Sequence, residues 1–325
     1  MIPVLAGLDI GGTKCAVVLG VEDEKGITLV AKQSFPTPET PDLALLLMMS
    51  ELERLLLERK GLELKAIGIS CGGPLDSNKG LILSPPNLPN WDRIDVLSPF
   101  RDRFHVPVSV QNDANACALA EWKWGAGKGT TNMIFLTFGT GMGAGFILDG
   151  RLYTGTNDMA GEVGHVRLEH DGPIGYGKAG SFEGFCSGGG IARLAQMKAD
   201  EWLAKGKMTS ICSSRDEIAA ITAKTVGEAA QAGDIFAKEI YNIVGQKLGR
   251  GLALLVDMLN PERIVIGSIY LRQEALLKPI VMEELRKEAL SFSLEVCTVV
   301  PSGLGESVGD LAALSVAKYG LEIEG

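Results

Sequence analysis

The stretch that decides the fold is Asp9-Ile10-Gly11-Gly12-Thr13-Lys14, near the start of the sequence. Residues 4–10 form a short apolar run that stops at the paired glycines, which predicts a buried strand entering a tight turn. Residues 15–19 resume the apolar pattern and predict the returning strand. The sequence therefore predicts a β-hairpin with glycines at its tip.

This hairpin tip has the composition of a phosphate-binding loop. Phosphate oxygens need backbone N–H donors, and glycine lets the backbone come close because it has no Cβ. Thr13 can add a hydroxyl donor and Lys14 a positive charge. Asp9, at the strand end, can orient magnesium through its water shell, since this ion keeps several waters. The alternative interpretation is an ordinary Asp/Gly hairpin without a ligand.

The same pattern occurs a second time in the middle of the chain. Residues 132–138 predict an apolar strand that includes Thr137, the tip contains Gly139-Thr140-Gly141, and residues 143–148 predict the returning strand. Two strand–turn–strand units of one type suggest a duplicated fold. The second tip is another candidate phosphate cradle, and two cradles can hold different phosphates of one nucleotide.

Strand and helix patterns alternate along the rest of the chain and predict an α/β fold. Predicted strands cover 27–33, 65–70, 106–111 and 263–266, and predicted helices cover 41–60, 114–124, 216–230, 234–259 and 306–319. Residues 150–190 are rich in glycine and predict a loop region. With no low-complexity linker, we predict two domains joined at a hinge: an N-terminal α/β domain of residues 1–113 plus 306–325, and a larger C-terminal α/β domain of residues 114–305.

The composition is that of a globular protein and excludes several classes. Hydrophobic residues make up 46% and charged residues 22%, so the chain can bury a substantial core. The net charge of −9, without a basic cluster, argues against nucleic-acid binding. The apolar run 43–49 is far shorter than the roughly 20 residues that span a bilayer, and no targeting segment is recognisable. The six cysteines are scattered without a CxxC pair, which predicts reduced thiols and a cytoplasmic protein.

Asp113 follows the strand predicted at 106–111, in the run Gln111-Asn112-Asp113-Ala114. A carboxylate at the start of a helix has two interpretations. Aspartate is a favoured helix N-cap because its side chain accepts backbone N–H bonds. It is also a candidate general base that takes the proton from an attacking hydroxyl. Both interpretations stay open on the residues alone.

Polar side chains gather in the glycine-rich middle of the chain. Glu162 and His165 lie in the run Glu-Val-Gly-His, and Glu183 follows after further glycines. Carboxylates beside histidine can bind the paired hydroxyls of a sugar, and solvated loop charge is the alternative. The turn at 86–91 adds Asn87 and Trp91, which could face a sugar ring. A rigid proline-rich turn is the alternative for this segment.

Taken in order, these motifs resemble the ROK family of bacterial sugar kinases and related repressors. The resemblance extends from Asp9 to the terminal helix. Its motifs are DIGGTK at 9–14, PPNLPNW at 85–91, NDANACALAE at 112–121, TFGTGMGAG at 137–145, GEVGH at 161–165, and Glu183 followed by SGG at 187–189. The resemblance implies two ribonuclease-H-like domains of the actin and hexokinase type flanking a cleft. It also implies a kinase that uses ATP and magnesium and forms a homodimer.

The resemblance further implies roles for individual residues. Asp113 would be the catalytic base. The sugar would be held by Asn87, Asn112, Asp113, Glu162, His165 and Glu183. The phosphates of ATP would be held by Gly11, Gly12, Thr13, Lys14, Thr137, Gly139, Thr140 and Gly141, with Asp9 on magnesium through water and Gly267 near the adenosine.

One segment departs from the family pattern. Many members carry a zinc-binding run of the form C-x-C-G-x-x-G-C-x-E after the histidine. The aligned positions here are Ile174, Tyr176 and Ser181, so the resemblance does not carry zinc over and we expect no zinc site. We expect either that Ile174, Tyr176 and Phe182 pack as a small apolar cluster, or that this loop is mobile until a sugar binds.

Three alternatives share parts of the pattern. A repressor of the family would carry a helix-turn-helix domain ahead of the sugar-binding part, and we expect no room for one before Asp9. An actin-type ATP-dependent binding protein would share the phosphate loops without needing Asp113 or Glu183. A sugar-binding sensor with weak catalysis would fit the missing zinc cysteines. Because family members phosphorylate several sugars, the resemblance implies a hexose or N-acetylhexosamine, with O6 as the expected acceptor.

Overall fold

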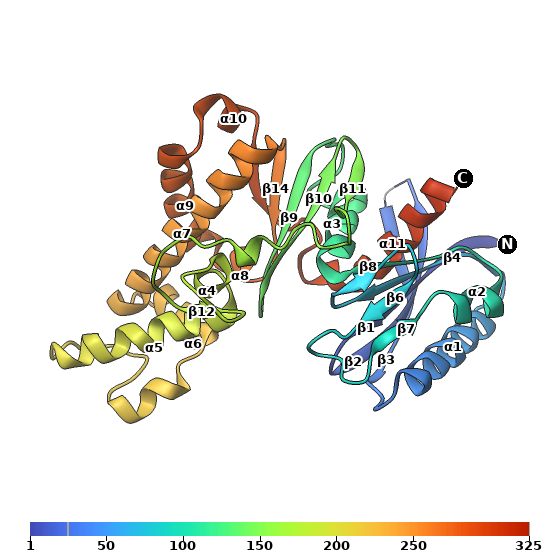
Figure 1. Cartoon of the computed structure of the whole chain (residues 1–325), viewed down its shortest axis with the longest axis horizontal. Helices are drawn as coiled ribbons and strands as arrows, with labels where there is room; N and C mark the ends of the chain where they lie inside the picture. The colour runs from blue at the N-terminus through green and yellow to red at the C-terminus, as the bar shows by residue number, and fades with distance from the viewer. Residues whose placement is uncertain (25, 325) are drawn as a thin grey trace. The chain divides into compact units, whose positions relative to one another are not determined.

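Two five-stranded sheets carry the fold (Figure 1). The computed structural model describes residues 1–24 and 26–324. The first sheet consists of β3 (Gly26–Pro36), β2 (Lys14–Asp23), β1 (Ile2–Ile10), β4 (Leu62–Cys71) and β8 (Val108–Asn112), in that order. The second consists of β11 (Arg151–Tyr153), β10 (Met142–Leu148), β9 (Met133–Phe138), β14 (Arg263–Ile266) and β15 (Thr298–Pro301).

Helices and short strands fill the connections between these sheet strands. The α-helices are α1 (Pro41–Glu58), α2 (Ser98–Phe104), α3 (Asp113–Trp124), α4 (Phe182–Phe185), α5 (Gly188–Ala204), α6 (Ala223–Gln231), α7 (Ile235–Leu259), α8 (Ile269–Arg272), α9 (Glu274–Glu288), α10 (Ser291–Glu295) and α11 (Val308–Glu324). The 3₁₀ turns are η1 (Val163–His165), η2 (Arg215–Ala220) and η3 (Gly305–Ser307). The short strands are β5 (Leu75–Asp76), β6 (Leu81–Leu83), β7 (Asp92–Asp95), β12 (Ile174–Gly175) and β13 (Lys178–Ala179).

The two large sheets have the same strand order, which confirms the predicted duplication and the α/β fold class. If the strands of each sheet are numbered along the chain, both read third, second, first, fourth, fifth. The first strand pairs parallel with the fourth in each case, as β1 with β4 and β9 with β14. The glycine-rich turns follow β1 and β9, so they occupy equivalent places in the two copies.

Chain contacts divide the protein into two compact units. Of the described residues, unit 1 comprises those of Met1–Thr131, Gly145–Ala160 and Gly303–Gly325, and unit 2 comprises Asn132–Ala144 and Gly161–Ser302. The division passes through β10 and groups α3 with unit 1, whereas the sequence predicted a boundary at residue 113. The domain limits 1–113 plus 306–325 and 114–305 stay a prediction. Among the described residues, no helix is both long and apolar enough to cross a membrane.

The first sheet is buried on both faces because its strands alternate apolar side chains to two sides. Helices α1 and α2 contribute to the core on one face, and α3 and α11 to the core on the other. Glycine lets α11 approach this sheet closely. A Cβ on Gly68 would lie 2.0 Å from the carbonyl oxygen of Ala313, and one on Gly7 would lie 2.9 Å from the nitrogen of Leu314. Larger residues at these positions would push the helix away.

Glu121 connects α3 to the segment that leads into α11. Its side chain is fully buried, and its carboxylate accepts hydrogen bonds from the backbone N–H groups of Ala126 (2.7 Å), Gly303 (3.1 Å) and Leu304 (3.1 Å). Three N–H donors stabilise a buried carboxylate in place of water. Glu121 therefore links segments of unit 1 that are far apart in the sequence.

The structure differs from the predicted elements in one long helix. The helix predicted at 216–230 is divided into η2 and α6, because Thr222 begins a new helix. The Thr222 hydroxyl accepts from the Thr225 N–H (3.2 Å), and the Thr225 hydroxyl accepts from the Thr222 N–H (3.0 Å), as in a capping box. All six cysteines are free thiols, as predicted.

We predict that Glu121→Gln destabilises the protein. The amide would place an N–H₂ group against backbone N–H donors, and the cost should be about 2–4 kcal/mol of unfolding free energy because bonds to a charged acceptor are lost. Urea unfolding measures this change, with the exposed Glu39→Gln as the matched control. Equal stability of the two variants would contradict the role of Glu121.

Candidate active site

The first glycine loop is a tight hairpin tip that Thr37 holds from one side. The Gly11 N–H donates to the carbonyl of Lys14 (3.1 Å) and closes the turn. The Thr37 N–H donates to the carbonyl of Thr13 (3.1 Å), and its hydroxyl donates to the carbonyl of Gly11 (2.5 Å). Carbonyl oxygens would repel a phosphate. Because two of them bond to Thr37, the loop is suited to an anion on its N–H side.

Gly12 lies against the turn that carries Asn87. A Cβ on Gly12 would lie 2.3 Å from the carbonyl oxygen of Asn87 and 2.9 Å from its Cβ, so only glycine fits there. This packing brings a predicted sugar ligand next to a predicted phosphate loop within unit 1. Trp91 in the same turn is 1% exposed and belongs to the hydrophobic core. The expectation that Trp91 faces a sugar is therefore wrong, because the indole anchors the turn to the core instead.

Strand register places Asp9 and Asp113 at the same edge of the first sheet. Asp9 in β1 pairs with Ser70 in β4, and Ser70 pairs with Gln111 in β8. Asp113 follows two residues later, where α3 begins. In parallel strands, the carboxyl ends meet at one edge, which is where α/β proteins bind their ligands.

The two carboxyl groups at this edge have raised pKa values. Burial, and then the negative charge of Asp113, raise the pKa of Asp9 from 3.8 to about 6, although Lys14 acts in the opposite direction. The Asp113 side chain is exposed, yet desolvation by the surrounding protein raises its pKa, against a hydrogen bond from the Ala114 N–H (2.8 Å). Perturbed carboxyl groups of this kind are typical of functional sites.

Asn112, and not Asp113, is the N-cap of α3. The Asn112 side chain accepts a hydrogen bond from the Asn115 N–H (2.8 Å). Asp113 is the first residue of the helix itself. Since the neighbouring residue supplies the cap, the carboxylate of Asp113 is not needed for it.

The second glycine loop belongs to unit 2 and is built in a similar way. The Gly139 N–H donates to the carbonyl of Gly141 (3.1 Å), and the Gly143 N–H donates to the Thr137 hydroxyl (2.9 Å). The carbonyl of Gly139 accepts from the N–H of Gly188, the first residue of α5 (2.7 Å). The N-terminus of this 17-residue helix therefore adjoins the loop, and helix N-termini favour anions.

Glu183 lies directly beside the second glycine loop. Its Oε2 accepts a hydrogen bond from the Met142 N–H (3.1 Å), and a Cβ on Gly141 would lie 3.0 Å from the same oxygen. A Cβ on Gly164 would lie 3.3 Å from the Cβ of Glu183, so the turn η1, which includes His165, packs against it. The structure thus brings two predicted sugar ligands of unit 2 close to one predicted phosphate loop.

The remaining predicted residues of unit 2 lie at the edges of the same region. Glu162 is exposed and immediately precedes η1. Gly267 ends β14, where its N–H donates to the carbonyl of Leu136 (3.0 Å). A Cβ on Gly139 would lie 3.3 Å from the Ser268 hydroxyl, so the end of β14 adjoins the glycine loop.

A short hairpin, and not an apolar cluster, forms the segment that precedes Glu183. Strands β12 and β13 pair antiparallel, with Tyr176 at the tip in the left-handed region (φ +43°). Ile174 is 54% exposed and Tyr176 is 69% exposed, whereas Phe182 is 1% exposed. The expected cluster of these three side chains is therefore wrong, because the hairpin directs its residues outward. The Tyr176 ring instead contacts the His165 ring edge-on, with centroids 5.0 Å apart.

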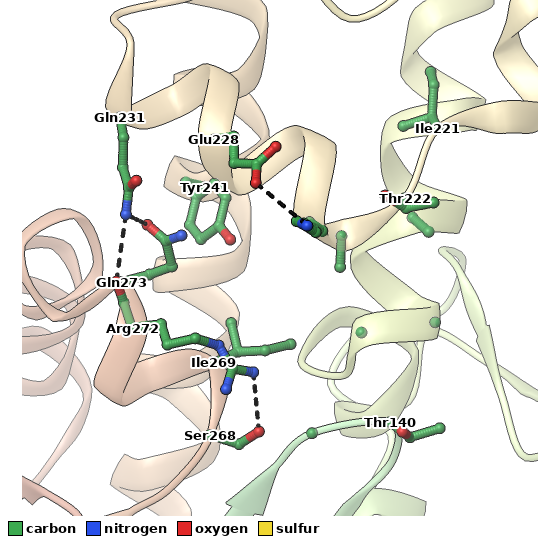
Figure 2. Close-up of a pocket in the computed structure, with 16 residues that line it drawn as sticks. Thr140, Ile221, Thr222, Glu228, Gln231, Tyr241, Ser268, Ile269, Arg272 and Gln273 are labelled. Carbon is green, nitrogen blue, oxygen red and sulfur yellow. Dashed lines mark hydrogen bonds and ion pairs between the residues drawn. The ribbon is translucent and has the colours of Figure 1, made fainter. Parts of the chain in front are cut away.

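Unit 2 also contains a pocket of about 760 Å³ that begins at the second glycine loop (Figure 2). This volume is typical of sites for small molecules and cofactors. Thr140 lies at one end, and the side chains of Gln231, Tyr241 and Gln273 lie at the other. Gln231 donates to Gln273 (Nε2 to Oε1, 2.9 Å). Burial raises the pKa of Tyr241 to about 12, so its hydroxyl keeps its proton.

Of the residues that line the pocket, the sequence predicted Gly139 and Thr140 as phosphate ligands, but it did not predict Gln231, Tyr241 or Gln273. They come from α6, α7 and the segment between α8 and α9, and no local motif marks them. Only the fold brings them together.

Asp9 is the candidate metal ligand of this site. Among the described residues, no group of three or more His, Cys, Asp or Glu side chains is arranged as a metal site. Magnesium requires fewer protein ligands, since it is held by one or two carboxylates and keeps several waters. Asp9 fits such an ion, because a bound cation would favour the charged carboxylate against the burial and the Asp113 charge that raise its pKa.

Comparisons with known proteins identify a family and a fold for nearly the whole chain. The sequence model of the ROK family matches residues 5–319. A glucokinase of Streptomyces coelicolor is 31% identical over 318 residues, which is 96% of each chain. The crystal structure of a ROK family glucokinase from Streptomyces griseus in complex with glucose and AMPPNP is 28% identical, with a TM-score of 0.73, over 97% of this chain and 99% of that one. The structure of a ROK hexokinase from Thermus thermophilus is 29% identical, with a TM-score of 0.78, over 99% of each.

We predict that Asp9→Asn stabilises the ligand-free protein in a pH-dependent way. The pKa of Asp9 is higher in the folded state than its ordinary value of 3.8. The folded state therefore binds more protons, and the free energy of unfolding falls as pH rises from about 4 to about 6. The gain from Asp9→Asn should be larger by about 1–2 kcal/mol above this window than near its lower end.

Urea unfolding across this pH range, without nucleotide or metal, measures the effect of Asp9→Asn. The exposed Asp102→Asn is the control and should show no such dependence. A difference between Asp9→Asn and the unchanged protein that stays constant with pH would contradict the raised pKa.

Proposed function

This chain belongs to the ROK family, and we propose that, as an ATP-dependent carbohydrate kinase, it phosphorylates O6 of a hexose or an N-acetylhexosamine, with D-glucose as the first candidate. The observation that carries the proposal is the set of groups at the edge of the first sheet. A glycine hairpin, a cation and two carboxyl groups with raised pKa values lie there together. Glucokinases among the relatives support glucose.

Asp113 is the proposed catalytic base. A sugar hydroxyl must lose its proton as it attacks the terminal phosphoryl group, and a carboxylate with a raised pKa is a stronger base than an ordinary one. The N-cap at Asn112 and the hydrogen bond from the Ala114 N–H fix this carboxylate at the start of α3. Asn112 and Asn87 are the proposed sugar ligands of unit 1.

The two glycine loops are the proposed phosphate sites. Backbone N–H groups of Gly11, Gly12 and Thr13, with the Lys14 ammonium, would bind phosphate oxygens in unit 1. Gly139, Thr140, Gly141 and the Thr137 hydroxyl would do so in unit 2. Asp9 would hold magnesium through water, and the ion, when bound, neutralises charge on the transferring phosphoryl group. Hydrogen bonds that engage carbonyl oxygens of both loops support this assignment, because free carbonyl oxygens would repel an anion.

The pocket of unit 2 is the proposed nucleoside site. It starts at the second glycine loop, adjoins the segment that follows Gly267, and is large enough for a nucleoside. Glu162, His165 and Glu183 are the proposed sugar ligands of unit 2, since carboxylates accept hydrogen bonds from paired hydroxyls. We propose that the protein is cytoplasmic and forms a homodimer. Analytical ultracentrifugation would test the oligomeric state.

The experiment that tests the function is a coupled assay of ADP release over a panel of sugars. D-Glucose, D-fructose, D-mannose, N-acetylglucosamine and N-acetylmannosamine cover the proposed acceptor class. Phosphate on O6 of the product, located by NMR, would support the proposal. Release of ADP with none of these sugars, at saturating ATP and magnesium, would refute it and favour a sugar-binding sensor.

We predict that Asp113→Asn lowers kcat by at least ~10²-fold, the low end for loss of a general base. Sugar affinity should fall much less, because Asn keeps one oxygen that accepts a hydrogen bond. Steady-state kinetics and calorimetric sugar binding separate the two effects. The exposed Asp102→Asn on α2 controls for removal of a carboxylate elsewhere in unit 1. Turnover close to that of the unchanged enzyme would exclude Asp113 as the base.

We predict that the enzyme needs magnesium and no zinc. A structural zinc site takes about four ligands, usually thiolate and imidazole. Ile174, Tyr176 and Ser181 supply no thiolate, and Ser181 instead caps α4 by accepting the Gly184 N–H (3.0 Å). After treatment with EDTA and dialysis, magnesium alone should restore full activity. Elemental analysis that finds about one zinc per chain in the active enzyme would contradict this prediction.

A further inference from the structure

The segment between His165 and Glu183 must be held in place, because it presents proposed sugar ligands at both ends. Its regular structure is limited to the two-residue strands β12 and β13. Its middle contains exposed residues, among them His170 and Asp171. Backbone pairing, including an isolated bridge between Arg167 and Ser181, joins the two ends of the segment to each other, so side-chain contacts are needed to fix the segment against the rest of unit 2.

Glu169 fastens this segment to helix α7. Its Oε1 forms ion pairs with Lys247 Nζ and with a guanidinium nitrogen of Arg250, the latter at 2.9 Å. Lys247 and Arg250 are three residues apart, so they lie on the same side of α7. Arg250 also donates to Glu284 on α9 (2.6 Å), whose side chain is 7% exposed. One carboxylate of the loop therefore joins a charge network between two packed helices.

The pair of Lys247 and Glu169 differs from an ordinary surface pair, which stabilises a protein little, whereas Glu169 and Arg250 are 38% and 40% exposed. The Lys247 side chain is only 12% exposed, and its ammonium lies 5.4 Å from the centre of the Phe185 ring. Lys247 and Arg250 both pair with Glu169, and Arg250 also pairs with the buried Glu284. Loss of the Glu169 charge would leave a nearly buried ammonium without its ion-pair partner, which is unfavourable.

Backbone bonds connect Glu169 to both proposed ligand positions. The N–H groups of Leu168 and Glu169 donate to the carbonyl of Gly180 (2.9 and 3.1 Å), and the Phe182 N–H donates to the carbonyl of Val166 (2.8 Å). Val166 follows His165 directly, and Phe182 directly precedes Glu183. A shift of Glu169 along α7 would therefore move both ends of the segment.

We propose that Glu169, Lys247 and Arg250 form an ionic clamp that positions the sugar ligands of unit 2. They are positioning residues, because their charged groups bind one another. The clamp holds the segment 166–182 in one register, and through it His165 and Glu183. The part of this inference that concerns the sugar rests on the proposed function.

Hydrogen exchange tests the clamp without any assumption about the substrate. In Glu169→Gln, peptides within 166–182 should exchange faster, while the strands of the second sheet keep their protection. The control is Glu283→Gln, which removes an exposed ion pair with Lys287 (2.6 Å) on α9. Unchanged exchange in 166–182, or equal acceleration throughout unit 2, would overturn the clamp. If Glu169→Gln does not fold, Lys247→Gln replaces it in the same comparison.

Kinetics with D-glucose at saturating ATP tests the link to sugar binding. Glu169→Gln should raise the KM for glucose by ~10-fold, equivalent to the loss of one modest interaction, with little change in kcat or in the KM for ATP. A merely structural loss would lower kcat through the amount of folded enzyme and leave the KM unchanged. That result would overturn the positioning role.

The salt dependence of the KM for glucose is an independent test of the clamp, because glucose itself carries no charge. Raising salt should increase the KM for glucose in the unchanged enzyme and in Glu283→Gln, since salt weakens partly exposed ion pairs. The same series should have little effect in Glu169→Gln. Equal salt dependence in all three proteins would exclude the clamp as its source. Absence of glucose phosphorylation by the unchanged enzyme would count only against glucose as the substrate, and hydrogen exchange would then decide the clamp.

Discussion

The constraint on which the site depends is the register of three parallel strands in unit 1. Asp9, Ser70 and Gln111 lie in one row across β1, β4 and β8, so Asp9 and Asp113 must end at the same edge of the sheet. Burial at this edge, and then the like charge of Asp113, raise the pKa of Asp9 to about 6. The fold tolerates this repulsion because the strands are fixed by core residues on both faces.

Duplication gives the protein two loops of one design with different supports. In both, a glycine turn follows the first strand of a sheet, and carbonyl oxygens of the turn are bonded to a neighbouring segment. In unit 1 this support is Thr37, which contributes a hydroxyl and an N–H. In unit 2 it is the start of α5 at Gly188, which also brings the positive end of a helix. Equivalent places in the two copies, both proposed as phosphate sites, therefore differ in their local chemistry.

Much of this architecture could be predicted from the sequence because its signals are local. Apolar runs that stop at glycine marked β1 and β9, and long apolar periodicity marked α7. The division between η2 and α6 was also visible, since Thr222 and Thr225 have the spacing of a capping box, but the continuous helical pattern outweighed it. The cap of α3 fell to Asn112 because the helix begins one residue earlier than predicted.

Other features could not be predicted because they depend on contacts between distant segments. Trp91 lies in a motif that resembles a ligand-binding turn, and only the packing of unit 1 shows that its ring belongs to the core. Gln231, Tyr241 and Gln273 meet in one pocket although each lies in a different part of the chain. The outward direction of Ile174 and Tyr176 follows from a two-residue hairpin that is too short for reliable recognition.

The two units differ in how the charged side chains near their proposed ligands are paired before any ligand binds. In unit 1, like charges face each other at the sheet edge, so a bound cation would remove an existing repulsion and its binding would be strengthened accordingly. In unit 2, Glu169 and the nearly buried Glu284 are each paired with a cation before any ligand arrives. A sugar is uncharged and cannot neutralise a carboxylate, so the segment that carries Glu183 is held by charges that are balanced within the protein itself. The edge of the first sheet, by contrast, holds like charges that a bound cation would neutralise.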